Sequence, residues 1–350
     1  MSQKEYFLMK MKIAVDAMGG DSAPLEIVKG SCLALEKNPL LEIVLYGDQT
    51  LITPIIEKNR LNRFFEKKQI IIKHTPHFLT MSDKNIRDQL KTKPDASLFL
   101  ALRGALNGEV KGVVSACGTQ VLVLASHLIL KKIPLMQRIA IAPIFKSFDN
   151  RVRILLDAGA NVELKPQHLL VFAHYASIIA QEVLSIKNPQ VKLLNIGHEA
   201  NKGRLIDLET YQLLSQSSLI NFGGNEEPQN LLTTSADILL SDGFTANIAL
   251  KTYEGTALNF MKNIKQIMTQ NSIKKIITKI YFQKELQKFK TKMDPREIGG
   301  AMLLGLNKVV IKAHGSSQAY AFCQAILQAQ KMIAANINQK ISQILEKQAS

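Results

Sequence analysis

The sequence predicts an α/β fold in which a largely parallel, doubly wound sheet lies between two layers of helices. Short apolar runs alternate with longer segments of helical periodicity along the 350 residues, and glycine, asparagine and aspartate gather directly after many of the runs. No fixed-period repeat or low-complexity linker interrupts the alternation. We therefore expect a single domain over 12–340, with an extension at 1–11 and a tail at 341–350.

The apolar runs and the helical segments give the expected elements in order. Strands are expected at 12–17, 42–47, 70–73, 112–115, 139–142, 153–157, 192–196, 219–221, 238–241 and 309–313. Helices are expected at 25–36, 97–106, 121–130, 166–184, 205–215, 246–266 and 318–339. Ligands of open α/β sheets bind beyond the carboxyl ends of the strands. We therefore expect the polar loops after the strands to converge on one edge and to line a phosphate-binding cleft.

The first strand ends in two aspartates that bracket a pair of glycines. Asp16 closes the strand, Gly19 and Gly20 turn the chain, and Asp21 follows just before Pro24 opens a helix. This order predicts a strand, a tight loop and a helix N-terminus, which together place backbone N–H groups around an anion. We expect the two aspartates to shape that site.

Composition excludes some classes of protein and leaves the partner open. No run of about 18 apolar residues is present, so the chain is not expected to cross a membrane. The first residues lack the features of a signal peptide and three scattered cysteines offer no disulfide framework, so we expect a cytoplasmic protein. A net charge of +15 suits an acidic protein, an anionic lipid surface or a nucleic acid.

Lysines concentrate in one segment, 262–292, which holds nine of them and a single acid, Glu285. The isoleucines spaced along one helix face in this segment are Ile273, Ile276, Ile277 and Ile280. With a turn at 271–272, the segment and the helix before it are expected to form a protruding hairpin over about 246–292. Its apolar face is expected to pack in a dimer or to rest on an anionic membrane. Both are possible together if two hairpins pair in a dimer and their exposed tips contact the membrane.

The motifs that commonly mark a nucleotide loop, a zinc protease or a serine nucleophile are absent from the sequence. Catalysis is therefore expected through positioning and electrostatics rather than through a covalent enzyme intermediate. A second informative motif follows the strand at 309–313, where His314 and Gly315 precede two serines that can cap a helix. We expect Ser316 to bind an anion, and His314 to contact phosphate, orient a carboxylate, protonate a leaving group or bond only to its own loop.

Several of these motifs resemble the bacterial phosphate acyltransferases called PlsX. The matching segments, in order along nearly the whole chain, are 13–21, 155–161, 242–247 with Lys251, 299–301 with Gly305, and 310–317. The resemblance implies a three-layer α/β/α fold of the isocitrate/isopropylmalate-dehydrogenase kind. It also implies an enzyme that transfers a fatty acyl group from acyl carrier protein to inorganic phosphate, forming acyl-phosphate for phospholipid (phosphatidic acid) biosynthesis.

The resemblance further implies a homodimer, peripheral attachment to the membrane, and a membrane glycerol-3-phosphate acyltransferase that receives the product. No cofactor and no metal are expected. The loops at 115–119 and 242–247 are expected to bind phosphate, and His314, Lys251 and Asp242 to be catalytic. The full set of expected substrate-binding residues is Asp16, Gly19, Gly20, Asp21, Ser115, Thr119, Arg138, Asp157, Asn161, Gly243, Asn247 and Ser316.

The chain departs from the family pattern in the loop that is expected to hold phosphate. Where the family usually has Ser-Ala-Gly-Asn-Thr-Gly-Ala, this chain has Ser-Ala-Cys-Gly-Thr-Gln-Val at 115–121. The proline that usually follows an arginine after the next helix is Ile139 here. In this region we therefore expect mainly Thr119 and Arg138 to keep the binding roles that the resemblance implies.

Two other functions stay open at this point. A metal- and nicotinamide-dependent dehydrogenase shares the implied fold, but it needs several acids around one divalent metal, and Asp157 and Asp242 have no acid beside them in the sequence. A noncatalytic basic scaffold on a membrane would also account for the charge. Nucleic acid is not an expected partner, because tryptophan is absent and the lysines lie beside isoleucines rather than stacking residues.

Overall fold

The computed structural model describes residues 11–286, apart from 60, 81, 82, 84, 135 and 148, and residues 299–349; the side chains of 274, 275, 277, 279 and 347–349 are not described. The strands are β1 Met11–Asp16, β2 Leu41–Gly47, β3 Ile70–His74, β4 Gly112–Ser115, β5 Ala140–Lys146, β6 Val152–Leu156, β7 Gln190–Leu194, β8 Asn221–Glu226, β9 Ile238–Leu240, β10 Ala301–Leu304 and β11 Val309–Lys312. The helices are α2 Leu25–Lys37, α3 Gln49–Lys58, α4 Arg63–Glu66, α5 Ile86–Thr92, α6 Ser97–Leu106, α7 Thr119–Leu130, α8 Pro166–Glu182, α9 Leu205–Gln216, α10 Gly243–Met268, α11 Ser272–Ile277, α13 Ala319–Ala334 and α14 Ile337–Ala349, with short turns η1 Pro228–Asn230 and η2 Thr278–Phe282.

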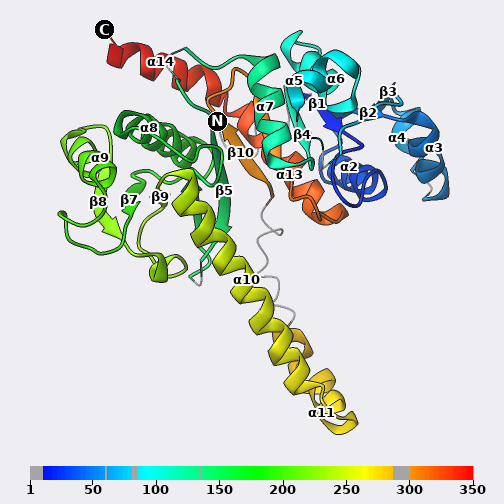
Figure 1. The fold of residues 1–350 in the computed structure, drawn as a ribbon. Helices are drawn as coiled ribbons and strands as arrows, with labels where there is room; N and C mark the ends of the chain where they lie inside the picture. The colour runs from blue at the N-terminus through cyan, green and yellow to red at the C-terminus, as the bar shows by residue number, and fades with distance from the viewer. Residues whose placement is uncertain are drawn as a thin grey trace.

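The strands form one eleven-stranded sheet in the order β3-β2-β1-β4-β11-β10-β5-β6-β9-β7-β8. Successive residues of a strand point to opposite faces, so Ile13 and Val15 pack under α2 and α13 while Ala14 packs under α6 and α7. On the other half of the sheet, α8 and α14 cover the first face and the start of α10 covers the second. Helices thus lie on both faces (Figure 1), which confirms the expected three-layer α/β/α class.

The sheet consists of two parallel blocks that run in opposite directions. Strands β1 to β4 and β11 run parallel to one another, as do β6, β9, β7 and β8. Between the blocks, β10 is antiparallel to β11 and to β5, and β5 is antiparallel to β6. The carboxyl ends of the two blocks therefore lie at opposite edges. The expectation that all the polar loops converge on one edge is wrong, because β5 and β6 pair antiparallel and the second block therefore runs the other way.

Other elements also differ from expectation. The strand expected at 219–221 is instead β8, which runs through Gly223 and Gly224 at the edge of the sheet, with a register shift against β7. The helix expected at 318–339 is divided by Asn336, whose φ of 52° ends α13 before α14 begins. Residues 341–349 are not a tail but the larger part of α14, where Ile341 and Leu345 are buried in the core. Met11 belongs to β1, and residues 1–10 of the expected extension lie outside the described residues.

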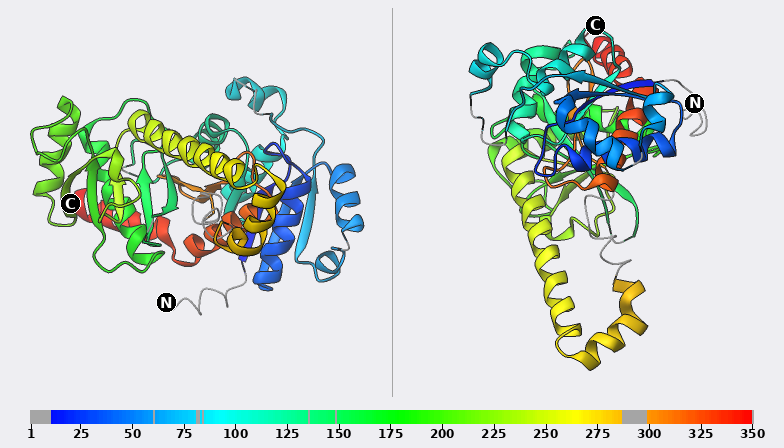
Figure 2. Two further views of the ribbon diagram at one scale, coloured as in Figure 1. Left: turned by 90° about the horizontal axis from the view of Figure 1, so that it is seen from below. Right: turned by 90° about the vertical axis from the view of Figure 1, so that its right-hand side faces the viewer.

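Helix α10 leaves the body of the molecule and ends in a hairpin. Figure 1 shows α10 running past the edge of the sheet, and the side view of Figure 2 shows the hairpin standing apart from the body. After a turn, α11 and η2 fold back, and Thr278 Oγ1 donates to the Met268 carbonyl over 2.7 Å. The predicted hairpin is confirmed as far as residue 286; residues 287–292 of it lie outside the described part. No helix within the described part is both long and apolar enough to span a bilayer.

Candidate active site

Three loops meet beyond the carboxyl ends of β1, β4 and β11. The Asp21 N–H donates to the Gly315 carbonyl over 2.8 Å, which joins the loop after β1 to the loop after β11. Gly20 has a φ of +105°, and a Cβ there would lie 2.9 Å from Ala116 Cβ and 3.0 Å from the Gly315 oxygen. Only glycine suits this conformation and this close approach. The structure therefore brings together the two motifs that the sequence singled out at its opposite ends.

A buried carboxylate holds these loops in place. Asp16 accepts hydrogen bonds from Ser97 Oγ over 2.6 Å and from Ser115 Oγ over 2.7 Å, and Ser115 Oγ accepts the Cys117 N–H over 3.1 Å. Burial raises the pKa of Asp16, although these hydrogen bonds favour its charged form. A Cβ on Gly19 would lie 2.5 Å from the Asp16 carboxylate. Asp16 is thus enclosed by its own loops and fixes their shape.

The loop after β4 leads directly into the N-terminus of α7. Gly118 is the N-cap residue and supplies no side chain to the first N–H groups of the helix. Such a helix end carries partial positive charge and unsatisfied donors, which suit an anion. Cys117 is buried, and burial raises the pKa of its thiol to about 12. This thiol stays protonated at neutral pH and is a poor nucleophile.

Lys312 is a site residue that the sequence analysis missed. It ends β11 in register with Ser115, and its Nζ donates to the Ala313 carbonyl over 3.1 Å. Burial lowers the pKa of this lysine, and its electrostatic neighbours include Cys117, Lys251 of α10 and Glu254. A charged residue directly after the buried run 309–311 was the signal that could have found it. Lys312 and Lys251 together bring two cations to the edge where the three loops meet.

His314 is exposed, and its ring is oriented by its own loop. The Ser316 N–H donates to His314 Nδ1 over 3.3 Å, and Ser316 Oγ lies 2.9 Å from the same nitrogen. Because Nδ1 accepts a hydrogen bond, the neutral ring carries its proton on Nε2. The structure therefore bears out the local bond that was one of the open expectations for this histidine.

Asp157 and Asp242 form a second cluster, at the carboxyl ends of β6 and β9. Asp157 accepts the Ile141 N–H over 2.9 Å and the Asn161 N–H and Nδ2 over 2.8 Å each. Burial raises its pKa despite these bonds. The Asn161 carbonyl in turn accepts the Gly243 N–H over 2.9 Å, which joins this loop to the start of α10.

Asp242 is the N-cap of α10. It accepts the N–H groups of Phe244 and Thr245 over 3.0 and 2.8 Å, and it pairs with Arg204, which also binds Asp207. Burial opposes its charge, but the bonds from Thr245 and Arg204 prevail and lower the pKa of Asp242. Its oxygens are thus occupied by its own helix and by Arg204, as expected of a residue that positions α10.

A groove of about 830 Å³ connects the two clusters. One wall is the exposed face of α7 from Thr119 to His127, and the other is the loop Gly159–Asn161. Arg138 and Lys132 line the end of the groove that lies away from Thr119 along α7. Of the expected binding residues, Thr119, Arg138 and Asn161 line this groove, with Thr119 and Arg138 at its two ends. Among the described residues, no group of three or more His, Cys, Asp or Glu side chains is placed to hold a metal ion.

Comparison with known proteins identifies the family. The model of a family described as "Fatty acid synthesis protein" matches residues 11–340. A phosphate acyltransferase of Aster yellows witches'-broom phytoplasma is 73% identical over 336 residues, covering 96% of this chain and 92% of the relative. The chain belongs to the phosphate acyltransferase family. Another phosphate acyltransferase, from Acholeplasma laidlawii, is 44% identical and covers 97% of this chain and 99% of its own.

Solved structures support the fold of this phosphate acyltransferase. A phosphotransacetylase from Streptococcus pyogenes superposes with a TM-score of 0.60 over 95% of this chain and 99% of that chain, at 15% identity. A phosphotransacetylase from Staphylococcus aureus superposes with a TM-score of 0.56 at 14% identity, covering 94% of each chain. At such identities the likeness concerns the fold alone. The relatives do not support the two alternatives, a dehydrogenase and a noncatalytic scaffold.

Proposed function

We propose that this phosphate acyltransferase transfers a fatty acyl group from acyl carrier protein to inorganic phosphate, and that its acyl-phosphate product enters phospholipid synthesis. One structural observation supports this most directly. The uncapped N-terminus of α7 opens into the groove, and Lys312 and Lys251 lie beside the loop that precedes it. Helix N-termini and ammonium groups are the usual protein ligands of phosphate.

In the proposed reaction, phosphate is the nucleophile. A phosphate oxygen attacks the thioester carbonyl carbon, the carbonyl oxygen gains negative charge in the tetrahedral intermediate, and the C–S bond then breaks to give acyl-phosphate and a thiolate. The pKa of an ordinary thiol is about 8.5, so the sulfur leaves without strong protonation. The protein therefore has to align two anionic groups and offset their charge, which is catalysis by positioning and electrostatics.

The site residues take roles that follow from their contacts. Thr119 and the N–H groups of the first turn of α7 bind phosphate together with Lys312. Lys251 and His314 offset the charge that develops during attack, with His314 oriented by Ser316. The buried residues Asp16, Asp157 and Asp242 act as positioning residues, because their oxygens already accept hydrogen bonds from the protein. Asn161 lines the wall of the groove that faces α7, and Asn247 supports this wall by packing against Gly159.

The reaction itself is the decisive test. Purified protein is mixed with long-chain acyl carrier protein, with and without phosphate, and free thiol is measured with a colorimetric reagent. We expect thiol release that depends on phosphate and is matched by acyl-phosphate formed. Equal thiol release with and without phosphate, or no thiol release at all, would contradict the proposal.

We further propose that the enzyme is a cytoplasmic homodimer attached peripherally to the membrane, where it passes product to a membrane glycerol-3-phosphate acyltransferase. The outer face of α10 exposes Phe244, Ile248 and Phe260 beside an apolar groove of about 680 Å³. Apolar patches of this kind usually mark an interface. Light scattering of Ile248→Asp should report a monomer where the unchanged protein is a dimer; a dimer of unchanged mass would contradict this placement of the interface. At the tip of the hairpin, Ile273, Ile276 and Ile280 are exposed as well, which suits contact with lipid.

A further inference from the structure

The groove beside α7 has the shape of a channel for an extended, mixed polar and apolar chain. Along α7, Thr119, Val123 and His127 recur every four residues and so form one stripe facing the groove. From Thr119 to His127 the stripe is about 12 Å long, since a helix rises about 1.5 Å per residue. The other lining residues are both polar and apolar, and include Gln120, Leu124, Gln137, Ile139 and Asn161. The lining therefore suits a ligand that carries both polar and apolar groups.

The end of the groove away from Thr119 is strongly basic. Lys132 and Arg138 line it with His127, and burial together with the charges of Lys132 and Arg87 lowers the pKa of His127. Burial also lowers the pKa of His168, and the positive charges of Arg138, Lys165 and Lys132 lower it further. These three cations therefore lie in the neighbourhood of His168.

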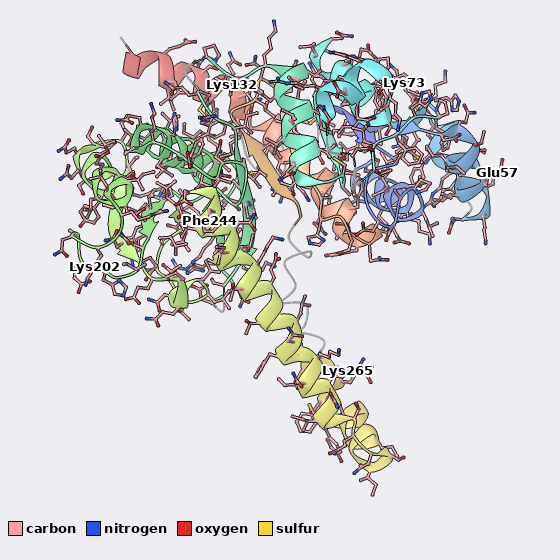
Figure 3. The ribbon with its side chains drawn as sticks, in the orientation of Figure 1. Glu57, Lys73, Lys132, Lys202, Phe244 and Lys265 are labelled. Atoms are coloured by element: carbon pink, nitrogen blue, oxygen red, sulfur yellow. The ribbon has the colours of Figure 1, made fainter. Side chains whose placement is uncertain are left out.

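Within the described residues, Lys132 and Arg138 form no ion pair with a carboxylate. Lys132 Nζ donates to the Gln137 carbonyl over 2.7 Å, and the Gln137 side chain pairs with His168 Nε2 over 2.9 Å. One acid, Asp83, also lines the groove, but its Oδ2 accepts the Thr80 N–H over 2.7 Å. Figure 3 shows Lys132 on the body of the molecule, away from Lys265 on the hairpin. This end of the groove therefore offers two cations that have no carboxylate partner in the described part of the chain.

The proposed substrate has an arm that fits both features. In acyl carrier protein the thioester hangs from a pantetheine arm that begins with a phosphodiester and contains two amides. About 13 bonds separate the phosphorus from the sulfur, which spans roughly 15 Å when extended at the spacing of a polypeptide backbone. Resting on the function proposed above, we propose that the arm lies in the groove, with its thioester at Thr119 and its phosphodiester between Lys132 and Arg138. The acidic carrier protein then docks over this basic end, where Arg87 and Lys165 add to the positive charge.

The test compares two small thioesters that differ only in the phosphate of the arm: acyl-4′-phosphopantetheine and acyl-pantetheine. We expect unchanged enzyme to prefer the phosphorylated arm by about 10-fold or more in kcat/KM, because a charge-assisted hydrogen bond contributes about 1.5–3 kcal/mol. In Lys132→Gln and Arg138→Gln this preference should fall toward unity through a higher KM. Lys131→Gln removes the same charge one residue away, outside the groove lining, and should keep the preference.

Binding of 4′-phosphopantetheine measured by calorimetry gives a second readout that does not depend on turnover, and thermal unfolding checks that each variant is folded. The inference is overturned if unchanged enzyme does not distinguish the two arms, or if both variants keep its preference. Its failure differs from failure of the proposed function. If only the inference fails, thiol is still released from acyl carrier protein when phosphate is present, but the enzyme does not prefer the phosphorylated arm. If the proposed function fails, no thioester gives phosphate-dependent thiol release.

Discussion

Asp16, at the end of β1, accepts a 2.7 Å hydrogen bond from Ser115 Oγ at the end of β4, and both residues are buried. The same hydroxyl accepts the Cys117 N–H, so one serine links a carboxylate to the loop that leads into α7. The shape of the proposed phosphate site thus depends on an interaction beneath it rather than on residues that touch the ligand.

Replacing Ser115 by Ala should therefore destabilise the protein. The change leaves the Cys117 N–H without its buried partner and removes one of the hydrogen bonds to the Asp16 carboxylate, which keeps the bond from Ser97. An unsatisfied buried group costs about 1–3 kcal/mol. Urea unfolding measures the loss. As a control, Ser215→Ala removes a hydroxyl from an exposed part of α9 and should change the free energy of unfolding by no more than about 0.5 kcal/mol. Equal stability of the two variants would mean that the buried link contributes nothing.

Lys312→Gln should raise the KM for phosphate by about 10-fold or more, because it removes a cation from a site in which charge-assisted bonds are strong. Lys312→Arg keeps the charge and should recover most of the affinity. Lys308→Gln, just before the start of β11, is the matched control and should leave the KM unchanged.

The pH dependence of phosphate binding tests the same residue. Burial lowers the pKa of Lys312 below the usual 10.5, so its positive charge is lost at a lower pH than that of an exposed lysine. The KM for phosphate should therefore rise on the alkaline side below pH 10.5. In Lys312→Arg this rise should move to higher pH, since arginine stays charged. An identical alkaline limb in both proteins would remove Lys312 from phosphate binding.

His314→Ala should cut turnover on the order of 100-fold if the ring stabilises charge in the transition state. The ring is exposed, so the substitution should leave thermal unfolding nearly unchanged. Ser316→Ala removes the hydroxyl beside Nδ1 but keeps the ring, and we expect an intermediate loss. Initial rates at saturating phosphate measure all three proteins. Turnover of His314→Ala equal to that of unchanged enzyme would exclude the histidine from the mechanism.

Much of the fold follows from local sequence, because buried strands of a parallel sheet are apolar runs ended by turn residues. The strand Met11–Asp16 and the loop to Asp21 were predicted this way. Strand β10 was missed because glycines flank its four residues, and α3 because Pro54 lies inside it. The opposite directions of the two blocks were missed too, because they follow from the antiparallel pairing of β5 with β6; β10 is antiparallel to both of its neighbours and leaves them running the same way.

The site was predictable only where a residue's role is set by its own loop. Gly20 and the pairing of Ser316 with His314 depend on neighbours in the sequence or on a recognisable turn. Tertiary packing decides the remainder. The lowered pKa of Lys312 depends on groups that the fold brings near it, including Cys117 and Lys251. Asp242 is occupied by Arg204, which lies 38 residues earlier. The groove that separates Thr119 from Arg138 exists only once α7 faces the loop after β6.

Gly159→Ala should destabilise the protein more than a typical glycine substitution. Gly159 has a φ of +121°, and a Cβ there would lie 2.2 Å from Asn247 Nδ2. The strained backbone costs about 1 kcal/mol or more, and the Asn247 side chain has to shift as well. Gly108→Ala separates the two effects, because Gly108 also has a positive φ but nothing lies near its would-be Cβ. Similar unfolding midpoints for both variants would show that the contact with Asn247 is unimportant.

Ile276→Glu should abolish binding to anionic vesicles and leave turnover of soluble substrate unchanged. Ile276 is 59% exposed on the hairpin, where a membrane would bury it, and a carboxylate there adds both desolvation and repulsion from anionic lipid. Ile196→Glu makes the same change at a residue 79% exposed on the body, after β7, and should bind vesicles like unchanged protein. Flotation with phosphatidylglycerol vesicles measures the bound fraction. Equal loss in both variants would point to net charge, and no loss in Ile276→Glu would leave the hairpin tip with a purely structural role.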